Sequence, residues 1–345
     1  MLFILALLVL IIFVTNKQRS YDPASALSVN TTQSIKGFFV ITVFFSHFCS
    51  YVTLDKWYDT PMQAYCHWLG QLMVVPFFFY SGYGIFESVQ KKGLPYIKSF
   101  PTKRILKTLF HFDLAVFLFV IYDVFFAPER LSAIKVFLSL FAWESIGNSN
   151  WFIFAIICAY LFCYLGLLLF KKNRFKAMLL TTILCLLYIA VISKIKDTYW
   201  VDSILAFPLG CAVSLWKKEI LSKLDWKRWI FYSIISVLFL ISAKKCLFPN
   251  YFLCSQIALV ALSALILLLP MRISFNSPML SYCGTYVFDI YILQRLPMNF
   301  GKYLHWNEQN VYLYFAFCLL STLLIAILFH KLTNKLDSLV FKERT

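Results

Sequence analysis

Two ionisable residues, Lys36 and His47, lie in one strongly apolar stretch of the chain, Ser34–Tyr51. They are 11 residues apart, close to three helical turns, so a helix would place both on one face. At about 1.5 Å per residue, His47 would lie roughly 16 Å beyond Lys36, near the middle of a bilayer whose apolar core is about 30 Å thick. An ionisable side chain at that depth is costly and is usually functional.

The imidazole of His47 suggests a specific chemistry. A neutral imidazole can take a proton from an attacking hydroxyl near pH 7, which is the task of a general base. The alternative is a packing role, with the ring hydrogen-bonded to a neighbouring helix or to the adjacent Ser46 or Ser50. Both interpretations fit this stretch.

A basic cluster comes next in the chain. Arg104 and Lys107 are three residues apart and would share a helix face, with Lys103 alongside and His111 one turn further on. At the mouth of a membrane span, such a cluster can bind a phosphorylated ligand. The alternative is an anchor that contacts lipid phosphates.

Further polar residues interrupt the apolar segments. Two glycines beside Ser81 and Tyr83 would allow close helix packing or a break next to a cavity. Glu87 is expected either as an interfacial charge or as a partner of Arg104. Pro208 predicts a kinked helix.

Ionisable groups on several helices predict one polar cavity inside the bundle. Trp151 could instead belong to an interfacial aromatic belt. The candidate cavity residues are Ser81, Tyr83, Glu87, Asn148, Trp151, Asp202, Asp289, Tyr291 and Arg295.

The composition defines the class of protein. The chain is 61% hydrophobic and only 14% charged, and apolar runs near the length of a membrane-spanning helix recur throughout, which predicts an all-α, polytopic transmembrane bundle. The net charge of +16 would suggest nucleic acid in a soluble protein, but the basic residues lie in short loops, so no nucleic-acid partner is expected. The scattered Cys and His predict neither a disulfide framework nor a metal site.

We expect about 10–11 spans, an extra N-terminal helix and linker at 1–33, a membrane domain at 34–330 and a basic cytoplasmic tail at 331–345. A short interfacial or re-entrant helix is expected at Leu131–Trp143. Most Lys and Arg fall in alternate loops, which predicts an outer N-terminus and a cytoplasmic C-terminus. The expected spans are 2–14, 36–54, 68–89, 108–126, 150–170, 177–193, 200–216, 229–243, 250–270, 279–300 and 311–330.

Together these segments resemble the integral-membrane acyltransferase family 3, many of whose members O-acylate cell-surface polysaccharides. The resemblance covers about Ser34 to His330, nearly the whole chain. It is carried by the order and spacing of Lys36…His47, the segment PFFFYSGYGI, Arg104-Ile-Leu-Lys107, Asn148-Ser-Asn-Trp151-Phe152, Phe207-Pro-Leu-Gly210 and Tyr282–Tyr291.

The chain departs from the family pattern at several points. Lys36 and Lys107 stand where the family has Arg, and Lys cannot make the bidentate phosphate contact that Arg makes. The His that usually follows the last motif is absent, and Gln294 and Arg295 stand nearby. The extra N-terminal helix lies outside the family's usual ten spans.

The resemblance implies an O-acyltransferase, multi-pass in a bacterial cytoplasmic membrane, that uses cytoplasmic acetyl-CoA or a related acyl-CoA. Lys36, Lys103, Arg104 and Lys107 would hold the donor's phosphates, and His47 would deprotonate the acceptor hydroxyl or relay the acyl group. The acceptor would be a surface or lipid-linked glycan, with polysaccharide-synthesis proteins as possible partners.

Two other functions fit a polytopic membrane protein. A transporter or flippase of a lipid-linked sugar would be expected to show repeats and paired broken helices, and the chain has no visible repeat. A non-catalytic partner in polysaccharide export is the other alternative, which the Arg-to-Lys departures favour.

Overall fold

The computed structural model describes residues 23–244, 251–273 and 277–341. Within these ranges the chain is almost entirely helical and has no β-strand. The expected first span, 2–14, lies outside the described residues. The α-helices are α2 (Val29–Cys49), α3 (Thr60–Leu69), α4 (Val75–Lys92), α5 (Leu94–Phe100), α6 (Lys107–Phe126), α7 (Ala133–Leu140), α8 (Trp151–Leu169), α9 (Arg174–Ile192), α10 (Ala206–Leu215), α11 (Lys217–Ser222), α12 (Trp226–Lys244), α13 (Tyr251–Leu268), α14 (Pro278–Thr285), α15 (Val287–Leu293), α16 (Arg295–Tyr303), α17 (Trp306–Gln309) and α18 (Val311–Val340).

The prediction of an all-α polytopic bundle is confirmed. Among the described residues, 6 helices are long and apolar enough to cross a membrane. Large apolar side chains such as Phe117 and Phe125 on α6 and Leu187 on α9 are exposed on the outside of the bundle, as expected where lipid is the solvent. The 6 helical segments are Gly70–Lys92, Leu94–Phe126, Trp151–Leu169, Arg174–Ile192, Phe252–Met271 and Val311–Val340.

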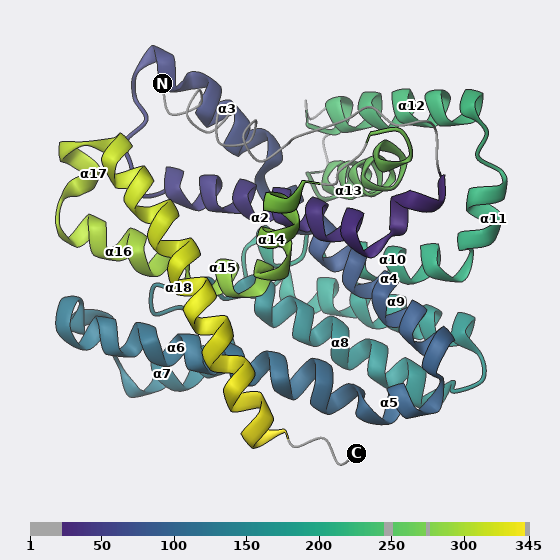
Figure 1. Cartoon of the computed structure of the whole chain (residues 1–345), viewed down its shortest axis with the longest axis horizontal. Coiled ribbons are helices and arrows are strands. Elements are labelled where there is room, and N and C mark those ends of the chain that lie inside the picture. Colours follow the sequence, from purple (N-terminus) through teal and green to yellow (C-terminus); the bar gives the residue numbers. More distant parts are fainter. Residues whose placement is uncertain (1–22, 245–250, 274–276, 342–345) are drawn as a thin grey trace.

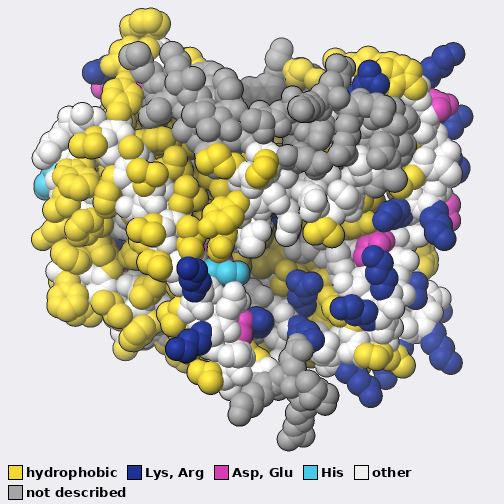
Figure 2. All heavy atoms as spheres, viewed as in Figure 1, with side chains coloured by type: hydrophobic (Ala, Val, Ile, Leu, Met, Phe, Trp, Pro, Cys, Tyr) yellow, Lys and Arg dark blue, Asp and Glu magenta, His cyan; other side chains and the backbone are white. Residues whose placement is uncertain are grey.

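Charge is distributed unevenly along the bundle. Many of the long helices run from left to right in Figure 1, with α5 and α11 at the right-hand end and α3, α16 and α17 at the left. Figure 2 shows Lys and Arg side chains gathered toward the right and hydrophobic side chains covering the left of the same face. The positive-inside rule predicts that the end with α5 and α11 faces the cytoplasm.

Two of the expected spans are broken or shortened in the structure. The span at 279–300 is three short helices, α14 to α16, that break at Tyr286 and Gln294. The breaks flank α15, and α15 lines a cavity. Non-helical backbone at membrane depth is tolerated beside a cavity. In the span at 200–216 only α10 is a regular α-helix. Pro208 lies in the first turn of α10, where its missing N–H breaks no helical hydrogen bond. Pro208 therefore lies at the beginning of a helix and does not kink the middle of one.

The first and last described long helices have other bounds than the spans expected there. Helix α2 begins at Val29, where the Ser28 hydroxyl caps it, and ends at Cys49, so its bounds are earlier than the expected span at 36–54. The expected boundary at residue 34 falls inside this helix. Residues 331–340, expected as a tail, continue α18.

The short helix expected at 131–143 is present as α7, and Ser132 caps its first turn by accepting a hydrogen bond from the Lys135 backbone N–H. Its apolar residues Ile134 and Phe137, and the following Phe141, are exposed. A short helix with such a face is typical of an interfacial position.

Two glycines bring α4 and α10 into backbone contact. A Cβ on Gly82 would collide with the Phe207 carbonyl, and a Cβ on Gly210 would collide with the Phe79 carbonyl. Small residues at a membrane helix crossing permit this close approach. Gly82 is therefore a packing residue, whereas a Cβ on Gly84 would meet no neighbour within 4 Å.

A second crossing of this kind fixes the first helix of the site. Gly37 on α2 lies against the backbone of Leu280 on α14, and Gly284 lies against the backbone of Gln33. Since Lys36 precedes Gly37 directly, this crossing sets the position of Lys36 relative to α14 and α15.

The two glycines of α4 provide a test of the first crossing. We expect Gly82→Ala to lower the free energy of unfolding by about 1–3 kcal/mol, because the added methyl must push two backbones apart. Gly84→Ala should leave it unchanged or raise it by up to about 1 kcal/mol, because Ala favours the helix. Thermal unfolding of the two purified variants measures the difference, and equal melting temperatures would contradict the assigned crossing.

Candidate functional site

A cavity of about 350 Å³, called the basic cavity below, opens between α2, α6, α8, α15 and α18. Figure 2 shows a hollow on this face with Lys, Arg and His side chains at its rim. The four cations expected to bind a donor, Lys36, Lys103, Arg104 and Lys107, all line the basic cavity. Lys36 is thus brought to the same opening as Lys103, more than sixty positions later in the sequence.

One continuous helical run presents most of these cations. Helix α5 passes through a π-helical turn, Pro101–Leu106, directly into α6. Single π turns inside α-helices are frequent at functional sites. The residues of this run that line the basic cavity are Lys103, Arg104, Lys107, Thr108 and His111.

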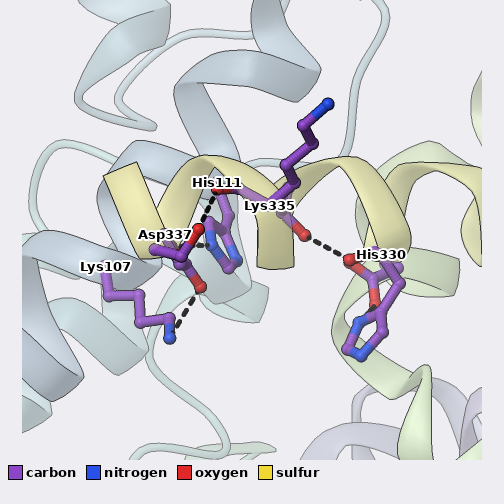
Figure 3. A network of polar contacts seen from close by, with 8 residues as sticks. Lys107, His111, His330, Lys335 and Asp337 are labelled. Carbon is purple, nitrogen blue, oxygen red and sulfur yellow. Dashed lines mark hydrogen bonds and ion pairs between the residues drawn. The ribbon is translucent and has the colours of Figure 1, made fainter. Parts of the chain in front are cut away.

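An acidic residue from the end of the chain partly neutralises this group. Asp337 of α18 lies 2.6 Å from the Lys107 amine and 2.8 Å from Nε2 of His111. Figure 3 shows Lys107 and His111 converging on Asp337. Within the described ranges the guanidinium of Arg104 donates to the Tyr96 hydroxyl, at 3.2 Å, and pairs with no carboxylate. Its charge therefore remains available to an anion.

A second His–Asp pair lines the same cavity. Nδ1 of His330 lies 2.8 Å from Asp289, whose side chain is buried. The sequence analysis selected Asp289 and missed His330 as a site residue. Like His47, His330 is an ionisable residue in an apolar span, and this pattern in the sequence indicates a functional residue.

A cavity of about 420 Å³, called the polar cavity below, lies toward the other end of α2. His47 lines it, together with four of the expected substrate-cavity residues, Asn148, Trp151, Tyr291 and Arg295. Ser46, Ser50, Ser145, Ser149 and Tyr199 contribute further polar groups to its wall.

His47 lies in the last turn of α2, two residues before the helix ends. The Ser50 hydroxyl donates to the His47 carbonyl at 2.7 Å and not to the ring. Nδ1 of the ring is buried without a hydrogen-bond partner among the described residues. The ring therefore makes no hydrogen bond through Nδ1 to a neighbouring helix in the described part of the chain.

The loop before α8 forms one wall of the polar cavity. The Asn148 side chain accepts from the Ile146 backbone N–H at 3.1 Å, and the Ser145 hydroxyl donates to the Asn148 carbonyl at 2.7 Å. Gly147 between them has a φ of 99°, which favours glycine. These bonds hold Asn148 and Trp151 at the cavity from a short, tightly folded loop.

Among the residues that the structure describes, Tyr291 alone lines both cavities. Its ring is buried, with its centroid 6.1 Å from that of His47 and 5.1 Å from that of Phe152. The Phe152 backbone lies close to its hydroxyl. The expected single cavity is therefore two cavities, and Tyr291 stands between them.

Three of the expected cavity residues lie elsewhere. Tyr83 accepts a hydrogen bond from the Lys217 amine at 2.8 Å, and Glu87 lies 3.7 Å from the same amine. Burial opposes the charge on Lys217, but these two neighbours outweigh it and raise its pKa. Glu87 thus pairs with Lys217 and not with Arg104. Asp202 is buried in the turn before α10 and lines neither cavity.

Ser81 lines the basic cavity, where the Tyr160 hydroxyl lies 3.4 Å from it. In the part of the chain that the structure describes, no three of His, Cys, Asp and Glu lie close enough together to hold a metal ion.

Comparison with known proteins decides the family. A family model for the acyltransferase domain of family 3 matches residues 33–331. The chain belongs to acyltransferase family 3. No curated protein and no solved structure shows significant similarity to it. The match covers both cavities, so the site described above belongs to a multi-pass membrane acyltransferase.

The two cavities should be reached from opposite sides of the membrane. Ser81 lines the basic cavity and Ser46 the polar cavity. We expect Ser81→Cys to react with a membrane-impermeant thiol reagent only in inverted vesicles, and Ser46→Cys only in intact cells, each above the background of the wild-type protein. Reaction of both variants from the same side would contradict this arrangement.

Proposed function

We propose that this acyltransferase transfers an acyl group, most simply acetyl, from cytoplasmic acyl-CoA to a hydroxyl of a surface or lipid-linked glycan. One observation carries the proposal. A cavity lined by four cations and a cavity lined by His47 lie on the two sides of a single shared residue, Tyr291. Such a protein would act in a bacterial cytoplasmic membrane, alongside proteins that synthesise the polysaccharide.

The basic cavity suits the donor. CoA carries several phosphates, and Arg and Lys side chains bind phosphate through charge-assisted hydrogen bonds. Arg104 supplies a planar guanidinium for bidentate contact, whereas Lys36, Lys103 and Lys107 act as point charges. Because Asp337 contacts Lys107, a bound phosphate would compete with this carboxylate for the amine.

The acyl group must then pass Tyr291 to reach His47. Rotation of the Tyr291 ring away from His47 and Phe152 would join the two cavities. This rotation would break the ring contacts with His47 and Phe152 and move the hydroxyl away from the Phe152 backbone. The arm of CoA that carries the thioester would fill the opening during transfer, and closure of the ring after CoA leaves would keep water from passing between the cavities.

His47 supplies the base. The imidazole takes the proton from the acceptor hydroxyl as its oxygen attacks the thioester carbonyl, and the C–S bond then breaks to release CoA as thiolate, which His47 can protonate. The carbonyl oxygen becomes an oxyanion in between. Arg295 lines the same cavity and is the cation available to stabilise it.

The polar cavity suits a sugar acceptor. Trp151 and Tyr199 offer apolar ring faces, while Asn148 and the neighbouring serines offer hydrogen-bonding groups. A sugar presents the same mixture of C–H faces and hydroxyls, and a few placed polar groups can fix its orientation. These residues lie toward the end of the bundle opposite the basic loops.

Replacing His47 tests the proposed base. We expect His47→Ala and His47→Gln to lower acyl transfer by about 10²–10⁴-fold, the usual contribution of a general base, while the proteins still insert in the membrane. His305→Asn is the matched control, because His305 is exposed and its φ of 57° suits Asn. NMR of the surface polysaccharide and CoA release by the purified protein give the readouts. Normal O-acylation by a well-inserted His47 variant would remove His47 from the mechanism.

Arg104→Ala tests the donor site. Loss of a charge-assisted hydrogen bond of about 1.5–3 kcal/mol predicts a KM for acyl-CoA about 10–100-fold higher, with kcat little changed. Lys98→Ala is the control, because Lys98 is an exposed cation on α5 that does not line the cavity. An equal effect of both variants would indicate a general charge effect on the cytoplasmic face.

A further inference from the structure

Two cysteines face each other beside the polar cavity. Sγ of Cys49, the last residue of α2, lies 3.0 Å from Sγ of Cys66 on α3. Both side chains are partly exposed, so a reagent can reach them. The other described cysteines are on α8, α9, α10, α13, α14 and α18.

The pair lies toward the outer end of the bundle. Cys49 is 13 residues after Lys36 on the same helix, about 20 Å further along its axis. If Lys36 lines the cytoplasmic mouth, as the proposed function requires, Cys49 lies on the opposite side of the membrane. Disulfides form and persist in that compartment in bacteria, and not in the cytoplasm.

Helix α3 already lies against α2 at this point. The Tyr65 hydroxyl donates to the Thr42 hydroxyl at 3.2 Å, and the Gln63 side chain donates to the Leu54 carbonyl. Leu54 lies in the loop between the two helices, so these bonds tie α3 both to α2 and to that loop. The segment that follows α3, Gly70–Val74, forms part of the wall of the polar cavity.

We propose that Cys49 and Cys66 form a disulfide that fastens α3 to the end of α2 and fixes this wall of the polar cavity. The oxidant is a disulfide-bearing oxidoreductase outside the cytoplasm. One thiolate attacks its disulfide to give a mixed disulfide, the second thiolate displaces the oxidoreductase, and two thiols of the oxidoreductase are formed as the Cys49–Cys66 bond is made. Cys49 is two residues from His47, so the bond holds the end of the helix that carries the proposed base.

Thiol counting on the full chain tests the proposal without any measurement of acyl transfer. The protein is isolated from cells under acid quench, denatured and treated with a maleimide reagent before or after reduction with dithiothreitol, and its mass is measured. Of the ten cysteines, we expect reduction to expose two additional thiols in the wild type. In Cys49→Ser and in Cys66→Ser, reduction should expose no additional thiol. In Cys158→Ser, on α8, it should expose two additional thiols, as in the wild type.

The same variants give a second measurement. Dithiothreitol should lower the melting temperature of the wild-type protein by a few degrees and leave that of Cys49→Ser unchanged. An equal number of labelled thiols before and after reduction would overturn the proposal, as would a gain that persists in both Ser variants or a disulfide-linked dimer on a non-reducing gel. Loss of acyl transfer in His47→Ala with an intact disulfide would separate this proposal from the proposed function.

Discussion

The site depends on one aromatic side chain, Tyr291, held between the rings of His47 and Phe152. A membrane enzyme that joins a cytoplasmic donor to an outer acceptor needs a route through the bilayer that does not leak water or ions. In the proposed mechanism, two cavities that meet at the buried Tyr291 ring provide such a route, and rotation of this ring opens it. Charge at one end and polarity at the other then suit two different substrates.

The helices around this junction are positioned by close backbone contacts and by breaks. Gly37 and Gly284 bring α2 against α14, which places Lys36 at the basic cavity. The breaks at Tyr286 and Gln294 turn α15 so that Asp289 and Tyr291 both line cavities. A continuous helix at 279–300 would carry the same residues, but without the two breaks its middle part could not change direction beside the cavities.

The sequence predicts much of this arrangement and fails at identifiable points. Hydrophobic runs predict the helices, and the spacing of Arg104 and Lys107 predicts their shared face, because both follow from helical periodicity. The division into two cavities depends on side-chain packing around Tyr291, which periodicity does not encode. The partners of Asp337 and Glu87 come from distant helices and need the tertiary structure, as does the contact between Cys49 and Cys66.

The central claim is that an acyl chain bound in the basic cavity reaches His47 by displacing Tyr291. A structure of the protein with a non-hydrolysable acyl-CoA analogue tests it most directly. We predict the phosphates at Arg104 and its neighbouring lysines, the Tyr291 ring rotated, and the carbonyl carbon within hydrogen-bonding reach of a hydroxyl held at His47. An analogue bound with Tyr291 still packed on His47 and its carbonyl confined to the basic cavity would contradict the account.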